Sequence, residues 1–248
     1  MRSPSSPTLH RIGTPVIGAL LSCMAMGACH KQPEPEAPVA RIEEEPSAPE
    51  RPEMDVASEI GGMNQEKVAR VFRRIGSDLA ECIQNGSERI EFLGGSVSFY
   101  LLIDQEGHLA HGHVKESTIG DRITESCMLD VLAAQEWPRP VGGKKGKIEY
   151  DNIRFEPSGD VRPPVEWSSD DIADQLEELS KDLNACKNGS HGSYVATMYV
   201  DTHGDPLAVG MAPPDEYGAE AVDCLVSVLE QAKFRSPGSW PAKVTFHL

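Results

Sequence analysis

Hydrophobic positions along the chain fall into two sets of elements, each predicted to run helix, strand, strand, helix, strand. The first helix is indicated by Val68, Phe72, Ile75 and Leu79, which return at helical spacing. The strands are indicated by runs of β-branched and aromatic residues between turn signals. The first set is predicted over residues 65–83, 96–103, 109–114, 121–135 and 147–155, and the second over 172–186, 194–200, 207–211, 218–232 and 243–248.

The two sets share one register, which indicates tandem copies of a single module. Residues 95–132 recur at 192–229 with a constant offset of 97 residues and no gap. The prediction is an α+β fold of two small modules, each with helices packed on a three-stranded antiparallel sheet. The predicted organisation is a lipoprotein signal peptide over residues 1–28, a tether over 29–63, a first module over 64–157, a linker over 158–167 and a second module over 168–248.

Three short motifs are typical of chain turns and helix ends. Asp104 and Gly107 open and close a four-residue turn between the first two strands, which makes a catalytic role for this Asp the weaker interpretation. The Asn-Gly pair at 85–86 is predicted to end the first helix. Ser168 and Asp171 have the spacing of a capping box at the start of the second copy.

The N-terminus has the pattern of an export signal. Arg2 and Arg11 accompany an apolar stretch over 16–26 that is too short to span a bilayer as a permanent helix. The sequence Met-Gly-Ala-Cys that ends at Cys29 resembles a bacterial lipoprotein box, in which the cysteine is lipidated. The alternative is a plain secretory signal cleaved near Ala28. Both interpretations predict export, and lipidation predicts membrane anchoring through acyl chains on Cys29.

The composition of the chain after the signal predicts a tether and disfavours some classes of partner. Residues 29–63 combine proline with glutamate and predict a semi-stiff, disordered tether. No Asp directly follows Cys29, so we expect the outer membrane, with the protein facing the periplasm. The formal net charge is −16, and loss of Arg2 and Arg11 with the signal gives −18. Such a surface repels phosphate backbones, so nucleic acid is not expected as a partner.

Four of the six cysteines are distributed evenly between the copies. Cys23 leaves with the signal and Cys29 is assigned to the lipid, which leaves two per copy. In an oxidising compartment this predicts one disulfide in each module, worth roughly 3 to 4 kcal/mol. The alternatives are four buried free thiols or, less favoured because no CxxC is present, a zinc site. The predicted pairs are Cys82 with Cys127 and Cys186 with Cys224.

Each copy resembles the TonB C-terminal-like modules, and in particular the C-terminal domain type of the AgmX/PglI gliding-motility proteins of myxobacteria. In the first copy, over residues 65–157, the resemblance is carried by the helix that ends in Cys82, the run 95–107, the Ser-Thr pair at 117–118, Cys127 and the Trp-Pro-Arg-Pro exit at 137–140. The second copy departs from this pattern, since Pro213 and Pro214 stand where the first copy has its Ser-Thr pair.

The resemblance implies a location in the cell envelope and a role in protein–protein contact. The residues that match are scaffold residues without a catalytic set, so the chain is expected not to be an enzyme and to need no cofactor. TonB-like modules engage partner strands along a sheet edge, and that strand could come from an envelope protein or from the sister module. The residues expected to line the partner-strand edge, on the third strand of each copy, are Ile148, Tyr150, Val244 and Phe246.

A histidine cluster suggests an alternative function as a periplasmic metal or small-ligand binding protein. His111 and His113 would project from one face of the second strand, and His108 would supply a third group. The other interpretation is a set of solvated histidines, because the corresponding residues of the second copy are Asp205, Ala208 and Gly210. A further alternative is an exported hydrolase that uses surface carboxylates, although spacing identifies no catalytic pair.

Overall fold

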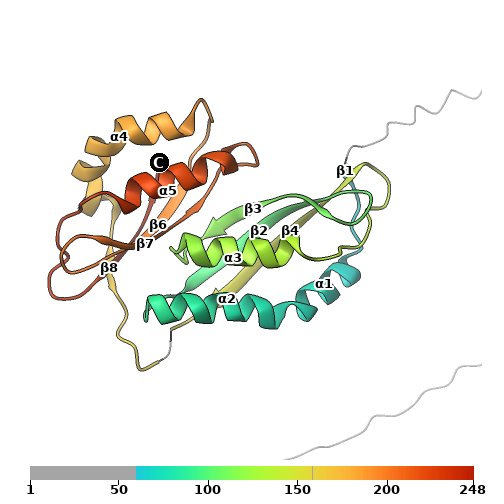
Figure 1. Cartoon of the computed structure of the whole chain (residues 1–248), viewed down its shortest axis with the longest axis horizontal. Helices are drawn as coiled ribbons and strands as arrows, with labels where there is room; N and C mark the ends of the chain where they lie inside the picture. The colour runs from blue at the N-terminus through green and yellow to red at the C-terminus, as the bar shows by residue number, and fades with distance from the viewer. Residues whose placement is uncertain (1–59, 158) are drawn as a thin grey trace, which may run out of the picture. The chain divides into compact units, whose positions relative to one another are not determined.

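The computed structural model describes residues 60–157 and 159–248 (Figure 1). The expected signal peptide, the lipidation site Cys29 and most of the expected tether lie outside the described residues. The described residues belong to one compact unit. It is an α+β structure with two separate mixed sheets, called the first and second sheet. Among the described residues, no helix has the length and apolar character needed to cross a membrane.

The first sheet has four strands in the order β1-β4-β2-β3, with β1 parallel to β4 and the other pairs antiparallel. Its helices pack on one face, towards which β2 directs the fully buried Phe99, Leu101 and Ile103. This half, called the first half, contains β1 (Ile60–Gly61), α1 (Gln65–Arg74), α2 (Gly76–Arg89), β2 (Gly95–Ile103), β3 (Leu109–Ser117), α3 (Arg122–Ala133) and β4 (Lys145–Phe155).

The second sheet has the same arrangement, in the order β5-β8-β6-β7 with β5 parallel to β8. Its β6 directs Ala196, Met198 and Val200 into a second core that α4 and α5 cover. This second half contains β5 (Val165–Trp167), a 3₁₀ turn (Ser169–Ile172), α4 (Ala173–Lys187), β6 (Val195–Val200), β7 (Pro206–Ala212), a second 3₁₀ turn (Gly218–Ala221), α5 (Val222–Glu230) and β8 (Ala242–His247).

The expectation of three-stranded antiparallel sheets is wrong, because each sheet has a fourth strand that is short and parallel to its neighbour. β1 lies in the stretch expected to be tether, and β5 lies in the stretch expected to be linker. Strands of two and three residues are too short to show an alternating pattern, so the sequence does not reveal them. As a consequence, the third strand of each copy, β4 or β8, is flanked on both sides over part of its length.

The first predicted helix is two helices, and its predicted end at 85–86 is wrong. α1 ends at Arg74 and α2 continues through Gly86 to Arg89. A Cβ at Gly86 would lie 2.3 Å from Thr124 Oγ1 and 2.6 Å from a methyl of Leu93. Glycine is therefore used here for the close approach of α2 to the start of α3, and not to stop the helix.

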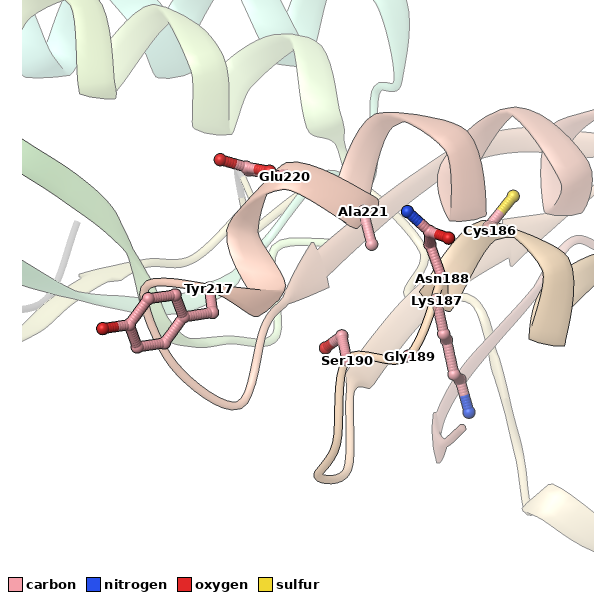
Figure 2. Close-up of a pocket in the computed structure, with 8 residues that line it drawn as sticks. All are labelled: Cys186, Lys187, Asn188, Gly189, Ser190, Tyr217, Glu220 and Ala221. Atoms are coloured by element: carbon pink, nitrogen blue, oxygen red, sulfur yellow. The ribbon is translucent and has the colours of Figure 1, made fainter.

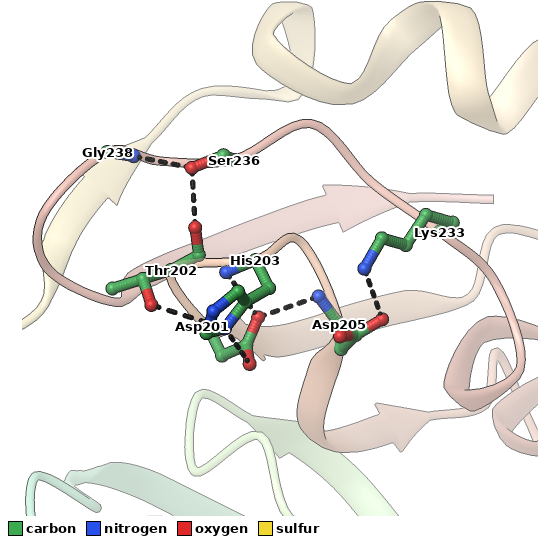
Figure 3. Close-up of polar contacts among 7 residues, drawn as sticks. All are labelled: Asp201, Thr202, His203, Asp205, Lys233, Ser236 and Gly238. Carbon is green, nitrogen blue, oxygen red and sulfur yellow. Dashed lines mark hydrogen bonds and ion pairs between the residues drawn. The ribbon is translucent and has the colours of Figure 1, made fainter.

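The predicted Asp-to-Gly turns are confirmed in both halves, with matching hydrogen bonds. Asp104 Oδ1 accepts from two backbone N–H groups of its turn, at 2.8 and 3.0 Å. Asp201 Oδ1 does the same, at 2.8 Å from His203 and from Asp205 (Figure 3). Gly107 and Gly204 close these turns at φ values of +94° and +89°. Each glycine then accepts a hydrogen bond from the backbone of the aromatic residue that follows a helix.

Two further local predictions are confirmed. Ser168 and Asp171 form the reciprocal bonds of a capping box at the 3₁₀ turn before α4. Both disulfides are present, with Cα–Cα distances of 5.7 Å for Cys82–Cys127 and 5.5 Å for Cys186–Cys224. Each bond ties the helix before the hairpin to the helix after it, and this connection helps small cores that bury limited apolar area.

Candidate functional site

Within the described residues, the outer side of β4 is open over most of its length. β1 pairs only with Lys145 and Gly146, and the described residues supply no strand beyond Gly146 on that side. The backbone carbonyl of Ser96 accepts a hydrogen bond from the Thr118 N–H on the β3 side. Because backbone groups alternate in direction along a strand, the N–H and C=O groups of Phe99 and Leu101 face β4.

That alternation decides which groups of β4 face outward. Tyr150 and Ile148 pair with Phe99 and Leu101, so their backbone groups bond inward to β2. Lys147 and Glu149 therefore direct their N–H and C=O groups outward. The side chain of Ile148 is buried and that of Tyr150 stacks on Phe72 at 3.4 Å between ring centroids. The outward groups thus lie one residue away from the two positions expected from the sequence.

The second sheet offers less open edge. Val244 pairs with Trp167 of β5, so the expected edge position at Val244 is covered by a strand. Tyr194 and Leu248 exchange two backbone bonds, which places Phe246 and Val244 in the inner ladder with β6 by alternation. The side chains of Val244 and Phe246 are buried in the second core.

A bulge and a charge network mark the open edge of the first sheet. Val97 pairs with Ile153 and Phe99 with Tyr150, so β4 carries one extra residue in between. The Glu149 carboxylate forms ion pairs with Lys147 Nζ, at 2.7 Å from Oε1, and with Lys115 Nζ, at 3.0 Å from Oε2. Bulges and charged side chains at edges oppose unselective pairing between sheets, while leaving the backbone groups available to a matched strand.

The histidines do not form a three-ligand site. His111 Nε2 lies 3.1 Å from His113 Nδ1, whereas His108 Nδ1 lies near the turn, 3.7 Å from Asp104 Oδ2. Within the part of the chain that the structure describes, no group of three or more potential metal ligands is assembled. His113 is buried, and this desolvation, followed by the nearby His111, lowers its pKa. The pair lies on the face of the first sheet opposite the helices.

A groove runs along this helix-free face. It consists of two cavities of about 230 and 380 Å³ that share Tyr100 and Glu216. One wall is formed by side chains of the first sheet, and the other by the segment that follows β7. The lining residues named for the two cavities include Ile60, Leu102, Lys144, Lys145, His113, Lys115, Glu149, Pro214, Asp215 and Tyr217.

The helix-free face of the second sheet is covered by the first half. Tyr199 is fully buried within the first core, together with Ala208 and Ala212 of β7. Its hydroxyl donates to the carbonyl of Gly94 at 3.1 Å and accepts from the N–H of Gly94 at 3.3 Å. Lys243 Nζ donates to the same carbonyl at 2.7 Å. The two sheets remain separate, so this joint is made by side chains and not by strand addition.

A buried acid completes the joint. Glu125 of α3 is fully buried, and its Oε2 accepts from the backbone N–H of Met211 in β7 at 3.1 Å. Burial raises the pKa of Glu125 to about 7, against the opposing effect of the hydrogen bond from Met211. Nearby, Arg122 pairs with Asp223 of α5 at 2.8 Å. Sequence reasoning missed Glu125, because a lone Glu in a helix carries no signal of burial.

A third cavity, of about 410 Å³, lies beside the second disulfide (Figure 2). Lys187 at the end of α4 lines it together with Asn188 and Ser190 of the following loop, and Tyr217 and Glu220 line it before α5. The Ser190 hydroxyl is engaged with the Tyr194 hydroxyl at 2.7 Å. No base lies within hydrogen-bond distance of this hydroxyl among the described residues, so the cavity lacks an activated nucleophile.

Comparison with known proteins finds no matching family model, no matching curated protein and no matching solved structure.

Proposed function

We propose that this protein is an acyl-anchored lipoprotein of the bacterial cell envelope that acts as a non-catalytic scaffold for protein–protein interaction. In this proposal the chain is anchored through Cys29, faces the periplasm from the outer membrane, and carries two tandem TonB-like modules. It needs no cofactor, since its task is to bind partner proteins.

The observation that carries the proposal is the open backbone of β4 at Lys147 and Glu149. Unpaired N–H and C=O groups at a sheet edge are satisfied when a partner adds a strand. β1 covers only the first two residues of β4, so a partner strand of about five residues has room beyond it. Main-chain bonds then supply affinity, and the flanking charges select the partner.

Two further observations support the proposal. The matching strand orders of the two sheets favour tandem copies of one module. Two disulfides in one small chain favour an oxidising compartment such as the periplasm. The first half is the better binding unit, because β5 covers Ala242 to Val244 of β8 and the first half covers the other face of the second sheet. The metal-binding alternative is not carried forward, since only two of the three histidines lie together.

The test compares two substitutions at one edge residue. Glu149→Pro removes the outward N–H of β4, whereas Glu149→Ala removes the same side chain and keeps that N–H. A photo-crosslinking residue at the exposed Arg154 would capture partners in native envelopes, with the same residue at the exposed Glu177 of α4 as the control position.

We expect a specific crosslinked protein at position 154 that is lost in Glu149→Pro and retained in Glu149→Ala. Both variants should keep the circular dichroism spectrum of the folded chain. Retention of the same crosslink in a folded Glu149→Pro variant would contradict binding by strand addition. Capture of the same proteins at position 177 would show that the contact is unspecific.

A further inference from the structure

The groove on the helix-free face of the first sheet has the shape of an extended binding site. Its two cavities share Tyr100 and Glu216 as lining residues, so they are neighbours on this face of the sheet. The floor of the groove is formed by side chains from three neighbouring strands. In the sheet register, Tyr100 of β2 lies between Glu149 of β4 and His113 of β3. The opposite wall is the segment after β7, which the packing of the two halves holds above this face.

The floor of the groove is a preformed aromatic surface. The Tyr100 ring stacks on the His113 imidazole, with 5.0 Å between centroids and 26° between planes. Lys147 Nζ lies 5.6 Å from the centre of the same ring. Tyr217 and Ile60, at the two ends, are 77% and 48% exposed. Rigid rings held in this way present apolar area at a low entropic cost to a ligand.

The second half already places an acidic, proline-containing segment against this floor. Residues 213–217 read Pro-Pro-Asp-Glu-Tyr, and Pro214, Asp215, Glu216 and Tyr217 line the groove with Tyr100 and His113. The charges of Asp215 and Glu216 act on His113, in the direction opposite to its desolvation. The floor thus accommodates carboxylates and prolyl rings at one end.

The other end of the groove carries a net positive charge. Lys144 and Lys145 are exposed and line the cavity with Ile60 and a single carboxylate, that of Glu216, and neither lysine forms an ion pair among the described residues. By contrast, Glu149 pairs with both Lys115 and Lys147. Two adjacent ammonium groups of this kind in a chain of net charge −16 form a local site for an anionic partner.

We propose that this groove binds an extended acidic peptide segment of a partner protein, whose carboxylates pair with Lys144 and Lys145 and whose prolyl or other apolar side chains pack on Tyr100. The inference rests on the proposed function as an interaction scaffold and specifies the chemistry of its partner. The side chain of Glu149 lines the groove, whereas its outward N–H belongs to the edge of β4, so Glu149→Ala is the reference for Glu149→Pro when the two contacts are tested separately.

The probe is a fluorescein-labelled peptide of twelve residues with alternating proline and glutamate. Peptides of equal length with lysine or glutamine in place of glutamate are the controls. Fluorescence anisotropy with the full chain measures binding to the wild type, to Lys144→Glu/Lys145→Glu and to Tyr100→Ala. Lys67→Glu/Lys181→Glu is the matched control, because it makes the same change of net charge at exposed residues away from the groove.

We expect the glutamate peptide to bind in a salt-dependent manner, with a loss of about tenfold or more in the Lys144→Glu/Lys145→Glu variant. Tyr100→Ala should weaken binding by a similar factor, and the matched control should bind within about twofold of the wild type. Equal binding of the glutamine or lysine peptide, or equal loss in the two charge-reversal variants, would overturn the proposal.

Failure of this proposal can be told apart from failure of the scaffold function. If the glutamate peptide does not bind while the crosslink at position 154 persists, the groove proposal alone is wrong. If the peptide binds to Glu149→Pro as it does to Glu149→Ala while no native partner is captured, the edge mechanism is wrong and the groove proposal stands.

Discussion

Glu125 and Met211 form one of the hydrogen bonds between the two halves of the molecule, from the Met211 backbone N–H to the fully buried Glu125 carboxyl group at 3.1 Å. The acceptor belongs to α3 of the first half, and the donor belongs to β7, the edge strand of the second sheet. A Cβ at Gly210 would lie 2.4 Å from Glu125 Oε1, so the close approach of β7 requires glycine there. The titratable side chain of Glu125 therefore packs against β7, the edge strand of the second sheet.

The burial of Glu125 predicts a pH dependence of stability. Its pKa is raised from 4.5 to about 7 in the folded chain, so between these values the folded state holds a proton that the unfolded state has lost. The free energy of unfolding should therefore fall as pH rises through this window, by up to about 3 kcal/mol in total. Urea denaturation at pH 4.5, 6 and 8 measures it.

The matched variant for this prediction is Glu125→Gln, which keeps an oxygen acceptor for Met211 and does not titrate. The difference in unfolding free energy between variant and wild type isolates Glu125 from the other carboxylates. We expect the variant to gain stability relative to the wild type as pH increases from 4.5 to 7. A difference that stays constant with pH would contradict the raised pKa.

The Tyr199 hydroxyl should contribute measurably to the joint. Tyr199→Phe removes its bonds to both backbone groups of Gly94, so the buried N–H of Gly94 would lose its partner while the carbonyl would keep its bond from Lys243. We expect a loss of about 1 to 3 kcal/mol, seen as a lower thermal midpoint. Tyr217→Phe is the control, since this ring is 77% exposed, and it should leave the midpoint unchanged. Equal thermal midpoints for the two variants would contradict a stabilising role of the Tyr199 hydroxyl.

The two disulfides should each stabilise their own half. Cys82→Ser/Cys127→Ser opens a loop of 45 residues and Cys186→Ser/Cys224→Ser opens one of 38 residues. Loop-closure entropy then predicts a loss of about 2 to 4 kcal/mol for each pair, measured by denaturation without reductant. A reductant should destabilise the wild type and each single-pair variant, but should not affect a variant that lacks both bonds. Insensitivity of the wild type would contradict the prediction.

The turn glycines should not tolerate a side chain. Gly107→Ala places a Cβ 2.5 Å from the Trp137 carbonyl oxygen, and Gly204→Ala places one 2.1 Å from that of Phe234, both at positive φ. We expect each to cost at least about 2 kcal/mol of unfolding free energy. Gly76→Ala is the control, because nothing lies within 4 Å of its Cβ at the start of α2. An equally large loss in that variant would show that the method reports a general intolerance of glycine substitution.

Local features of this protein could be predicted from the sequence because each is determined by residues close together in the chain. The hairpins, the Asp-to-Gly turns and the capping box depend on periodicity and on turn or cap chemistry within a few residues. The disulfide pairs were predicted from the repeat, which placed Cys127 and Cys224 at equivalent positions. The helical stripe at Val68 and Phe72 also predicted α1 correctly.

Contacts between distant residues were decided only by the tertiary structure. β1 and β5 are too short to have a period, and Gly86 continues α2 because α3 lies against it. The outward direction of Lys147 and Glu149 depends on the register with β2, and a shift of one residue reverses it. The burial of Glu125 and the groove at Tyr100 depend on how the two halves pack. The sequence by itself therefore determined the repeated elements, and the packing of those elements determined the candidate sites, because burial and edge exposure are properties of the assembled chain.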